Sequence, residues 1–404
     1  YVPKMLSGEW TGTMCLTEPH AGSDVGSAST GATRNGDGTY NVQGTKIFIS
    51  GGDNDLGENV IHLVLARIDG AEPGTKGLSL FIVPRVAINE DGSLGDENDV
   101  TVPSIEHKMG INGSATCVMN FGDEGNCLGE VVGGVEHQGI RQMFHMMNAA
   151  RIGVGIQGLA VAAASYLSAL EYARERKQGA SVKKFKDANA PRVPILEHPN
   201  IRRDLLAMKA RVEGVRALIM KLSNHADRLR ATQGKDDESE AYHKGQIDLL
   251  TPLVKAYGTD AAFEVSSSAI QVHGGHGYLR DYPVEQYCRD SKIFQIYEGT
   301  NFIQSMDLVS RKLGQGGGAN TQAFLTDIQR FVDANRDTPE LADAIKHLQG
   351  AHEAVAASVS QLVGWFKGGK LEHIPLAAEQ FLTIMSELAV GWLLLDQASI
   401  ALRK

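Results

Sequence analysis

The chain has 404 residues, of which 42% are hydrophobic and 22% charged, and its formal net charge is −9. These values are typical of a soluble globular protein with two or three domains. They argue against nucleic-acid binding, because phosphate contacts need clustered Lys and Arg side chains. No stretch approaches the roughly 20 apolar residues that cross a membrane, so no membrane span is predicted.

The four cysteines lie far apart in the sequence and match neither metal-binding nor redox spacing. They predict free thiols in a reducing compartment, so we expect a cytoplasmic protein, with the mitochondrial matrix left open. The chain begins without an initiator Met, and residues 8–13 already have the pattern of a domain interior. We therefore expect an upstream segment to be missing, together with any targeting peptide.

Residues 1–132 have the pattern of strands and turns. Three runs are apolar or alternate over strand lengths, at 61–67, 77–83 and 117–121, with Gly, Asn and Asp between them. This pattern predicts an antiparallel β-barrel or sandwich. The loop 14–26 is rich in Thr, Ser and Gly, and such loops present hydroxyls and backbone N–H groups to anions. Taken alone, it is more often an ordinary surface turn, and Phe48 in the stretch 44–52 is more often a core residue.

The remainder of the chain shows helical periods. The clearest apolar stripe runs from Ile201 to Leu222 in steps of four and three. Four long helices are predicted, over 143–178, 201–222, 249–271 and, with a break, 283–313, and four antiparallel helices form a bundle. A Gly-rich linker at 314–319 separates them from a further helical region. The predicted fold class is therefore α+β multidomain, with three parts: a β-domain at 1–132, a four-helix bundle at 133–313 and an appended helical region at 320–404.

The stretch 281–304 combines two helical patterns with a break between them. Pro283 suits a first helical turn, and Thr300 is a good N-cap for the helix that follows. At the break, Gly299 permits backbone conformations that are closed to other residues. Glu298 therefore lies on a short turn held by rigid elements on both sides. A carboxylate in such a place is a candidate general base, although many interhelical turns carry a Glu with no such role.

Several short motifs together resemble the acyl-CoA dehydrogenase family. They follow the order and separations of that family, at 17–24, 44–52, 271–278, 282–285, 289–290 and 296–300. The resemblance implies an FAD flavoprotein whose β-domain binds the flavin, preceded in the family by a helical domain that is missing here. The appended region at 320–404 resembles a larger subgroup that includes 3-methylmercaptopropionyl-CoA dehydrogenase-like enzymes.

The resemblance also implies roles for individual residues. It assigns cofactor binding to Thr17, Ser23, Phe48, Ser50, Arg176, Gln271, Gly274, Gly275 and Thr300. Thr17 would lie at the isoalloxazine edge and Ser23 near the pyrophosphate, while Phe48 would pack on the flavin where the family often has Trp. Arg176 would reach the flavin of a neighbouring subunit. Phe302 replaces a Gln that usually touches the adenosine side of the cofactor.

In the family, the Glu of the Tyr-Glu-Gly-Thr motif commonly removes a proton from the acyl thioester, and this role maps to Glu298. The Arg near that base maps to Arg151. Members whose base lies on another helix carry Glu where this chain has Ala150, so Glu298 is the base that the resemblance implies. His273 and His276 lack a third ligand nearby, so no metal site is expected.

The implied activity is FAD-dependent α,β-dehydrogenation of an acyl-CoA thioester to the trans-2-enoyl-CoA, as in fatty-acid β-oxidation. The implied electron acceptor is an electron-transfer flavoprotein, and the implied assembly is a homodimer or homotetramer. Two alternatives stay open. One is an acyl-CoA oxidase or a related flavoprotein oxidase or monooxygenase on the same fold, and the other is a non-catalytic helical assembly module.

Overall fold

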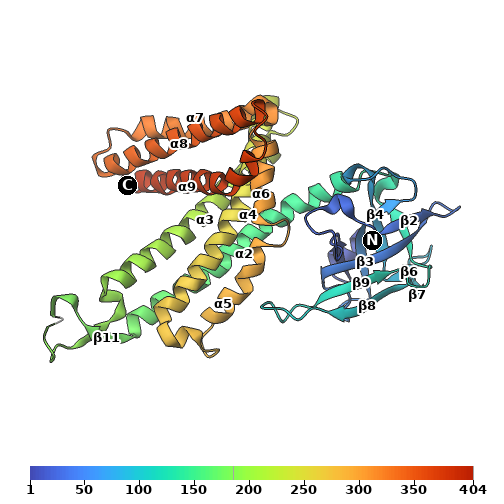
Figure 1. Cartoon of the computed structure of the whole chain (residues 1–404), viewed down its shortest axis with the longest axis horizontal. Helices are drawn as coiled ribbons and strands as arrows, with labels where there is room; N and C mark the ends of the chain where they lie inside the picture. Colours follow the sequence, from blue (N-terminus) through green and yellow to red (C-terminus); the bar gives the residue numbers. More distant parts are fainter. Residues whose placement is uncertain (185, 404) are drawn as a thin grey trace. The chain divides into compact units, whose positions relative to one another are not determined.

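The computed structural model describes residues 1–184 and 186–403. The chain divides into two compact units, Tyr1–Met147 and Asn148–Lys404. The first unit carries the main β-sheet, and the second is mostly helical (Figure 1).

The first unit is built on one sheet, preceded by a short helix α1 (Val2–Ser7). The strands of the sheet are β1 (Trp10–Cys15), β2 (Gly31–Arg34), β3 (Tyr40–Ser50), β4 (Asn59–Ile68), β5 (Leu78–Pro84), β8 (Val100–Ile105), β9 (Thr116–Phe121) and β10 (Leu128–Val131). Their order is β1-β4-β5-β10-β3-β9-β8, and β2 pairs with both β3 and β4. A separate two-stranded ribbon is formed by β6 (Val86–Ile88) and β7 (Leu94–Glu97).

Most neighbouring strands run antiparallel, as the sequence predicts, but β1 and β2 each run parallel to β4. These two pairs depart from the antiparallel arrangement that the sequence predicts for the β-domain. A parallel pair needs a long connection, and the chain between β1 and β4 contains a polar loop and two further strands. Local turn signals indicate hairpins only, so they could not reveal this pairing.

The core of the first unit is formed mainly by buried side chains of these strands. Nearly every residue of β4 is buried, which explains why its sequence is a continuous apolar run and not an alternating one. One cluster of buried core residues consists of Cys15, Ala32, Tyr40, Val42, Ile49, Val64, Ala66, Ile68, Phe81, Val83, Cys117, Met119, Phe121 and Cys127. Three of the four cysteines are thus buried core residues, and all four are free thiols.

Three long helices form the framework of the second unit: α2 (Gly139–Glu175), α3 (Pro199–Thr232) and α4 (Asp237–His273). The helix α2 begins within the first unit. Asp236 caps α4, because its side chain accepts a hydrogen bond from the Ser239 N–H at 3.0 Å. A Cβ atom at Gly158 of α2 would lie 2.5 Å from the carbonyl oxygen of Gly258 in α4. Small residues therefore permit close approach of these helices, as their composition predicts.

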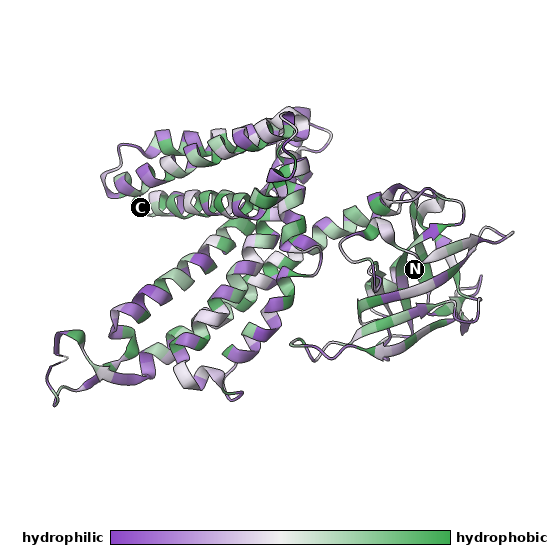
Figure 2. Cartoon of the chain, in the orientation of Figure 1, coloured by the Kyte–Doolittle hydropathy of each residue, from purple (hydrophilic) through white to green (hydrophobic). Residues whose placement is uncertain are grey.

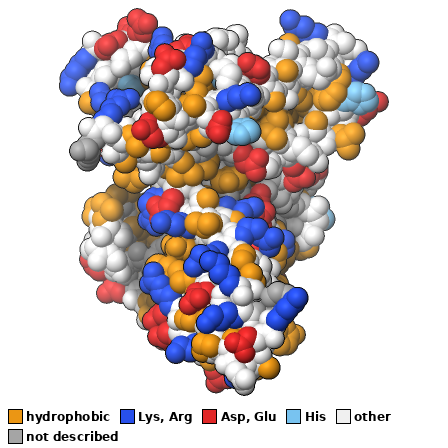
Figure 3. All heavy atoms as spheres, turned by 90° about the vertical axis from the view of Figure 1, so that its left-hand side faces the viewer, with side chains coloured by type: hydrophobic (Ala, Val, Ile, Leu, Met, Phe, Trp, Pro, Cys, Tyr) orange, Lys and Arg blue, Asp and Glu red, His pale blue; other side chains and the backbone are white. Residues whose placement is uncertain are grey.

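The fourth predicted helix is a series of short segments: α5 (Val284–Ser291), the 3₁₀ turn η7 (Lys292–Gln295), α6 (Asn301–Asp307) and the π-turn η8 (Leu308–Lys312). The predicted break falls between η7 and α6. After α2, a small hairpin of β11 (Lys177–Ala180) and β12 (Arg192–Pro194) was not predicted. Lys and Arg side chains gather on the lower part of the face shown in Figure 3.

The appended region consists of α7 (Ala319–Asn335), α8 (Ala342–Lys367) and α9 (His373–Leu402). These helices share one hydrophobic core with α3 and α4, and all five helices belong to the second unit. Phe324 and Trp392 meet edge to face with ring centroids 6.2 Å apart, and Val390 packs against Gly214 of α3. The appended helices therefore dock on the bundle, and Figure 2 shows hydrophobic residues recurring along all of them.

Two helices correct the expectation about membrane-spanning stretches. By length and composition alone, α2 and α9 are each apolar enough to cross a membrane. The statement that no stretch approaches this limit was therefore wrong. Buried residues of α9 belong to the hydrophobic core of the second unit, among them Met385 and Leu388, and a core helix of a globular protein meets the same criterion.

Candidate active site

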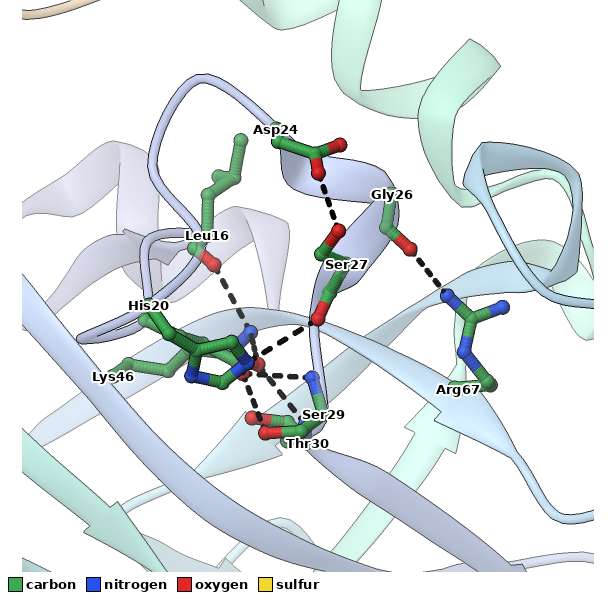
Figure 4. A network of polar contacts seen from close by, with 10 residues as sticks. Leu16, His20, Asp24, Gly26, Ser27, Ser29, Thr30, Lys46 and Arg67 are labelled. Carbon is green, nitrogen blue, oxygen red and sulfur yellow. Dashed lines mark hydrogen bonds and ion pairs between the residues drawn. The ribbon is translucent and has the colours of Figure 1, made fainter.

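A buried ion pair between Lys46 and Glu18 anchors the loop that follows β1. Lys46 of β3 and Glu18 of the loop are both buried, and their charged groups lie 2.8 Å apart. Glu18 also accepts hydrogen bonds from the N–H groups of Ser29 (2.7 Å) and Thr30 (3.0 Å). Lys46 donates a second hydrogen bond to the Leu16 carbonyl at 3.0 Å (Figure 4). These contacts fix the backbone at both ends of the loop.

Burial and the surrounding groups act in opposite directions on the pKa of each member of this pair. Burial raises the pKa of Glu18, but hydrogen bonds from Lys46, Thr30 and Ser29 together bring it down to about 2. Burial lowers the pKa of Lys46, and the Glu18 carboxylate opposes that change. Each charge is thus stabilised mainly by the other, which makes the pair sensitive to the loss of either member.

Phe48 lies on a β-bulge of β3. The register between β3 and β9 shifts between Lys46 and Ile49, and Phe48 has a φ of 61°. For a residue with a side chain, this left-handed conformation costs about 1–2 kcal/mol. The ring of Phe48 is 60% exposed, so it does not belong to the core. An exposed aromatic ring on a strained backbone is typical of a ligand-binding position.

The predicted hydroxyl residues lie near this bulge or on the adjoining loop. The carbonyl oxygen of Thr17 accepts a hydrogen bond from the Ile47 N–H at 2.9 Å, so Thr17 and Phe48 are close neighbours. Ser50 is exposed at the end of β3, where it pairs with Thr116 of β9. Ser23 is exposed on the loop. Asp24, the residue after Ser23, lines a surface depression of about 560 Å³. The other lining residues are Gly26, Ser27, Ala28, Arg67, Ala71, Pro73, Gly74 and Thr75.

Glu298 lies on the turn between η7 and α6, in the second unit. Its φ is 55° and that of Gly299 is 79°, so two successive residues are left-handed. Thr300 caps α6 as predicted, because its hydroxyl accepts a hydrogen bond from the Ile303 N–H at 3.2 Å. The side-chain amide of Gln304 donates to the carbonyls of Glu298 (3.4 Å) and Gly299 (3.1 Å). The turn is thus tied to the helix that follows it.

Two buried cations act on the Glu298 carboxylate. Arg151 of α2 is 5% exposed and forms an ion pair with Asp307 at 3.3 Å, and Lys255 of α4 is fully buried. Burial raises the pKa of Glu298, and both Arg151 and Lys255 lower it, with burial the larger influence. A carboxylate with a raised pKa is better matched to accept a proton from carbon than one at its ordinary value.

The remaining predicted residues form a separate group at one end of the helical unit. They are Arg176, which follows α2, and Gln271, Gly274 and Gly275 at the end of α4, and all four are exposed. Tyr172 stacks on His273 with ring centroids 4.4 Å apart, which brings these two helix ends together. Along α4, Gln271 lies roughly 16 Å from Asp260 beside the Glu298 turn, so this group is distinct from the turn.

The structure assembles the predicted site residues in three places. Thr17, Ser23, Phe48 and Ser50 lie in the first unit, Arg151, Glu298 and Thr300 come together in the second, and Arg176 groups with the end of α4. Within residues 1–184 and 186–403, no three His, Cys, Asp or Glu side chains gather as metal ligands.

Sequence reasoning missed the residues that support these places. They are the buried residues Glu18 and Lys46 next to the first loop, and the buried Lys255 and half-buried Asp260 beside the Glu298 turn. One signal for Lys255 was available, because it interrupts an otherwise apolar stretch of α4. A buried lysine is rare unless it has a partner. The sequence therefore indicated a polar contact for Lys255 but did not identify the partner.

Comparisons with known proteins agree with this architecture. Residues 13–123 match the family model for the middle domain of acyl-CoA dehydrogenases, and residues 137–313 match the model for the C-terminal domain. Residues 324–404 match a model described as acetyl-CoA dehydrogenase C-terminal like. A crystal structure of an acyl-CoA dehydrogenase from Bacillus anthracis, complexed with FAD, has a TM-score of 0.74 at 25% identity, covering 98% of this chain and 64% of that one. This likeness confirms the predicted fold class.

The chain belongs to the acyl-CoA dehydrogenase family. It is 34% identical to an acyl-CoA dehydrogenase from Bacillus subtilis, over 78% of this chain and 71% of that protein. It is 41% identical to a butyryl-CoA dehydrogenase from Syntrophomonas wolfei, over 100% of this chain and 66% of that protein. It is 40% identical to the 3-methylmercaptopropionyl-CoA dehydrogenase of Ruegeria pomeroyi, over 97% of this chain and 65% of that protein. The chain thus spans about two thirds of the length of these last two relatives.

Proposed function

We propose that the protein, at its full length, is an FAD-dependent acyl-CoA dehydrogenase that forms a trans-2-enoyl-CoA and passes electrons to an electron-transfer flavoprotein. The observation that carries the proposal is the Glu298 carboxylate. It is fixed on a left-handed turn, its pKa is raised by burial, and buried Arg151 and Lys255 act on it. Family membership and relatives named for butyryl-CoA and 3-methylmercaptopropionyl-CoA support a thioester substrate.

Glu298 supplies the base that the reaction needs. The α-proton of a thioester is weakly acidic, so its removal requires a positioned base and stabilisation of the charge that develops on the carbonyl oxygen. In the proposed mechanism the Glu298 carboxylate accepts the α-proton, and the Glu298 backbone N–H donates a hydrogen bond to the thioester carbonyl. Arg151 favours the ionised carboxylate, because its charge opposes the effect of burial on the pKa of Glu298.

The residues of the first unit fit a flavin. The exposed ring of Phe48 offers a stacking face, and the neighbouring Thr17 and Ser50 offer hydroxyls for the edge of a heterocycle. Ser23, on the loop held by Glu18, would meet the pyrophosphate. When bound, the flavin supplies the redox chemistry by taking up the β-hydrogen with its electron pair.

The group at the end of α4 supports a shared cofactor site and hence an oligomer. Arg176, Gln271, Gly274 and Gly275 are exposed and lie away from the Glu298 turn. We propose that they bind the flavin of a neighbouring subunit, which requires a homodimer or homotetramer. Free cysteines support a reducing compartment, and we propose a cytoplasmic location and a role in β-oxidation.

The test replaces the base without changing its shape. In the full-length protein, Glu298→Gln should still bind butyryl-CoA, but flavin reduction in an anaerobic single turnover should slow by roughly 10²–10⁴-fold. Glu298→Asp should retain some activity, because the carboxylate survives. Glu285→Gln is the matched control, since Glu285 is paired with Arg289 on the neighbouring helix α5, and its rate should be unchanged. Near-normal reduction by Glu298→Gln would remove Glu298 from the mechanism. Rapid reoxidation of the reduced wild-type flavin by O₂ alone would instead indicate an oxidase.

A further inference from the structure

One carboxylate of α4 is joined to both ends of the turn that carries Glu298. The Oδ1 atom of Asp260 accepts a hydrogen bond from Gln295 Nε2 at 2.7 Å and another from Asn301 Nδ2 at 2.8 Å. Gln295 is the last residue of η7 before the turn, and Asn301 is the first residue of α6 after it. The same oxygen atom therefore ties the two ends of the turn together.

The other end of the Asn301 amide is held by a buried lysine. Lys255 Nζ donates to Asn301 Oδ1 at 2.9 Å, and the Thr259 hydroxyl contacts the same oxygen at 3.2 Å. The Lys255 and Thr259 residues are fully buried. Because Lys255 donates to the amide oxygen and Asp260 accepts from the amide nitrogen, the orientation of Asn301 is determined by partners on both sides.

These contacts surround a strained segment. The left-handed conformation of Glu298 costs about 1–2 kcal/mol, and such strain persists only where the surrounding structure over-determines it. We propose that Asp260, Lys255 and Asn301 form a clamp that holds the Glu298 turn in the geometry required for proton abstraction. Asp260 and Lys255 are thus positioning residues, which act on the substrate only through Glu298. This inference rests on the proposed function of Glu298 as the base.

The clamp also includes a charged group, the Lys255 ammonium, that acts on the Glu298 carboxylate. Burial lowers the pKa of Lys255 to about 7; Asp260 and Glu298 act to raise it and Arg151 to lower it. Burial raises the pKa of Asp260, and its hydrogen bonds from Gln295 and Asn301 lower it. Below pH 7 the Lys255 ammonium is charged and lowers the pKa of Glu298. Removing that charge therefore raises the pKa of the base.

The test uses two kinds of variant in the full-length flavoprotein, with butyryl-CoA as the probe. Asp260→Ala should slow flavin reduction by on the order of 10²-fold, the effect of a base displaced by about 1 Å, while the Kd for butyryl-CoA changes less than about threefold. Amide hydrogen exchange at 296–301 should accelerate, which reports the turn itself without turnover. Asp260→Asn keeps the Oδ1 acceptor and should recover most of the rate. Lys255→Met should move the acid limb of the reduction rate to higher pH.

A control and two outcomes make the test decisive. Glu238 is an exposed acid in the first turn of α4, and Glu238→Ala should leave both the rate and the exchange at 296–301 unchanged. If Glu298→Gln abolishes reduction while Asp260→Ala and Lys255→Met keep the rate, the pH profile and the exchange of the wild type, the clamp is refuted and the base stands. If Glu298→Gln itself reduces flavin normally, the proposed function fails first.

Discussion

The ion pair beneath the first loop leads to a prediction whose size follows from the structure. Lys46→Met removes the ammonium and leaves the Glu18 carboxylate buried with its hydrogen bonds from Ser29 and Thr30 and the imidazole of His20 at 3.7 Å. Breaking a buried pair in this way typically costs 3–5 kcal/mol. Because about 1.4 kcal/mol corresponds to a factor of ten, hydrogen-exchange protection of the β3 amides should fall by roughly 10²–10⁴-fold at pH 7. FAD retention should fall as well, since the same loop carries Thr17 and Ser23.

The pH dependence provides the second half of this test. The pKa of Glu18 is lowered from its ordinary 4.5 to about 2, so its ion pair stabilises the fold above pH 4.5 and this contribution is lost as the pH falls toward 2. In Lys46→Met the carboxylate becomes neutral at a higher pH, so the difference from the wild type should shrink between pH 7 and pH 4. Lys76→Met, at an exposed lysine of the same unit, should have no effect at either pH. Unchanged protection at pH 7, or an equal loss at both pH values, would refute the reasoning.

Two further substitutions test the strained aromatic residue and the docked helices. Phe48→Gly should weaken FAD binding, measured by titration of the flavin-free protein. Its thermal stability should be unchanged or raised by about 1 kcal/mol, because glycine tolerates the left-handed φ and the Phe48 side chain is exposed. A large loss of stability would instead place the ring in the core. Gly214→Ala should destabilise the helical unit by about 1–3 kcal/mol in thermal unfolding, because its Cβ would lie 2.3 Å from Val390 Cγ1 of α9. Gly350→Ala in α8, where nothing lies within 4 Å of the added atom, should be neutral or stabilising, and equal behaviour of the two variants would contradict the docking of α9 on α3.

Much of the fold could be predicted from local patterns. The stripe from Ile201 to Leu222 lies within the helix α3, and the Thr300 cap begins α6 where predicted. Periodicity and capping are properties of neighbouring residues, so a sequence displays them directly. The parallel pairing of β1 with β4 was missed because it joins strands that are distant in the chain, and no local signal encodes that contact.

The residues of the candidate site could be predicted from the sequence, but the contacts that hold them could not. Glu298 and Phe48 could be named from motifs that resemble the family, but their positive φ values could not. A sequence shows that Gly299 permits a left-handed turn, whereas the hydrogen bonds from Gln304 to the Glu298 carbonyl and from Asn301 to Asp260 appear only in the structure. Strain of this kind is decided by tertiary contacts, which lie outside the reach of local propensity.

Both strained functional candidates are supported in the same way. Phe48 follows shortly after Lys46, and Glu298 lies beside Lys255, and both lysines are fully buried. Each ammonium donates to a group that fixes a nearby backbone segment: Lys46 to Glu18 and to the Leu16 carbonyl, Lys255 to the side chain of Asn301. A buried charge is costly unless its partners are in place, so any rearrangement of either segment would strand an ammonium in the interior. The cost of that rearrangement keeps an unfavourable φ populated at the two positions that we propose to face the flavin and the substrate.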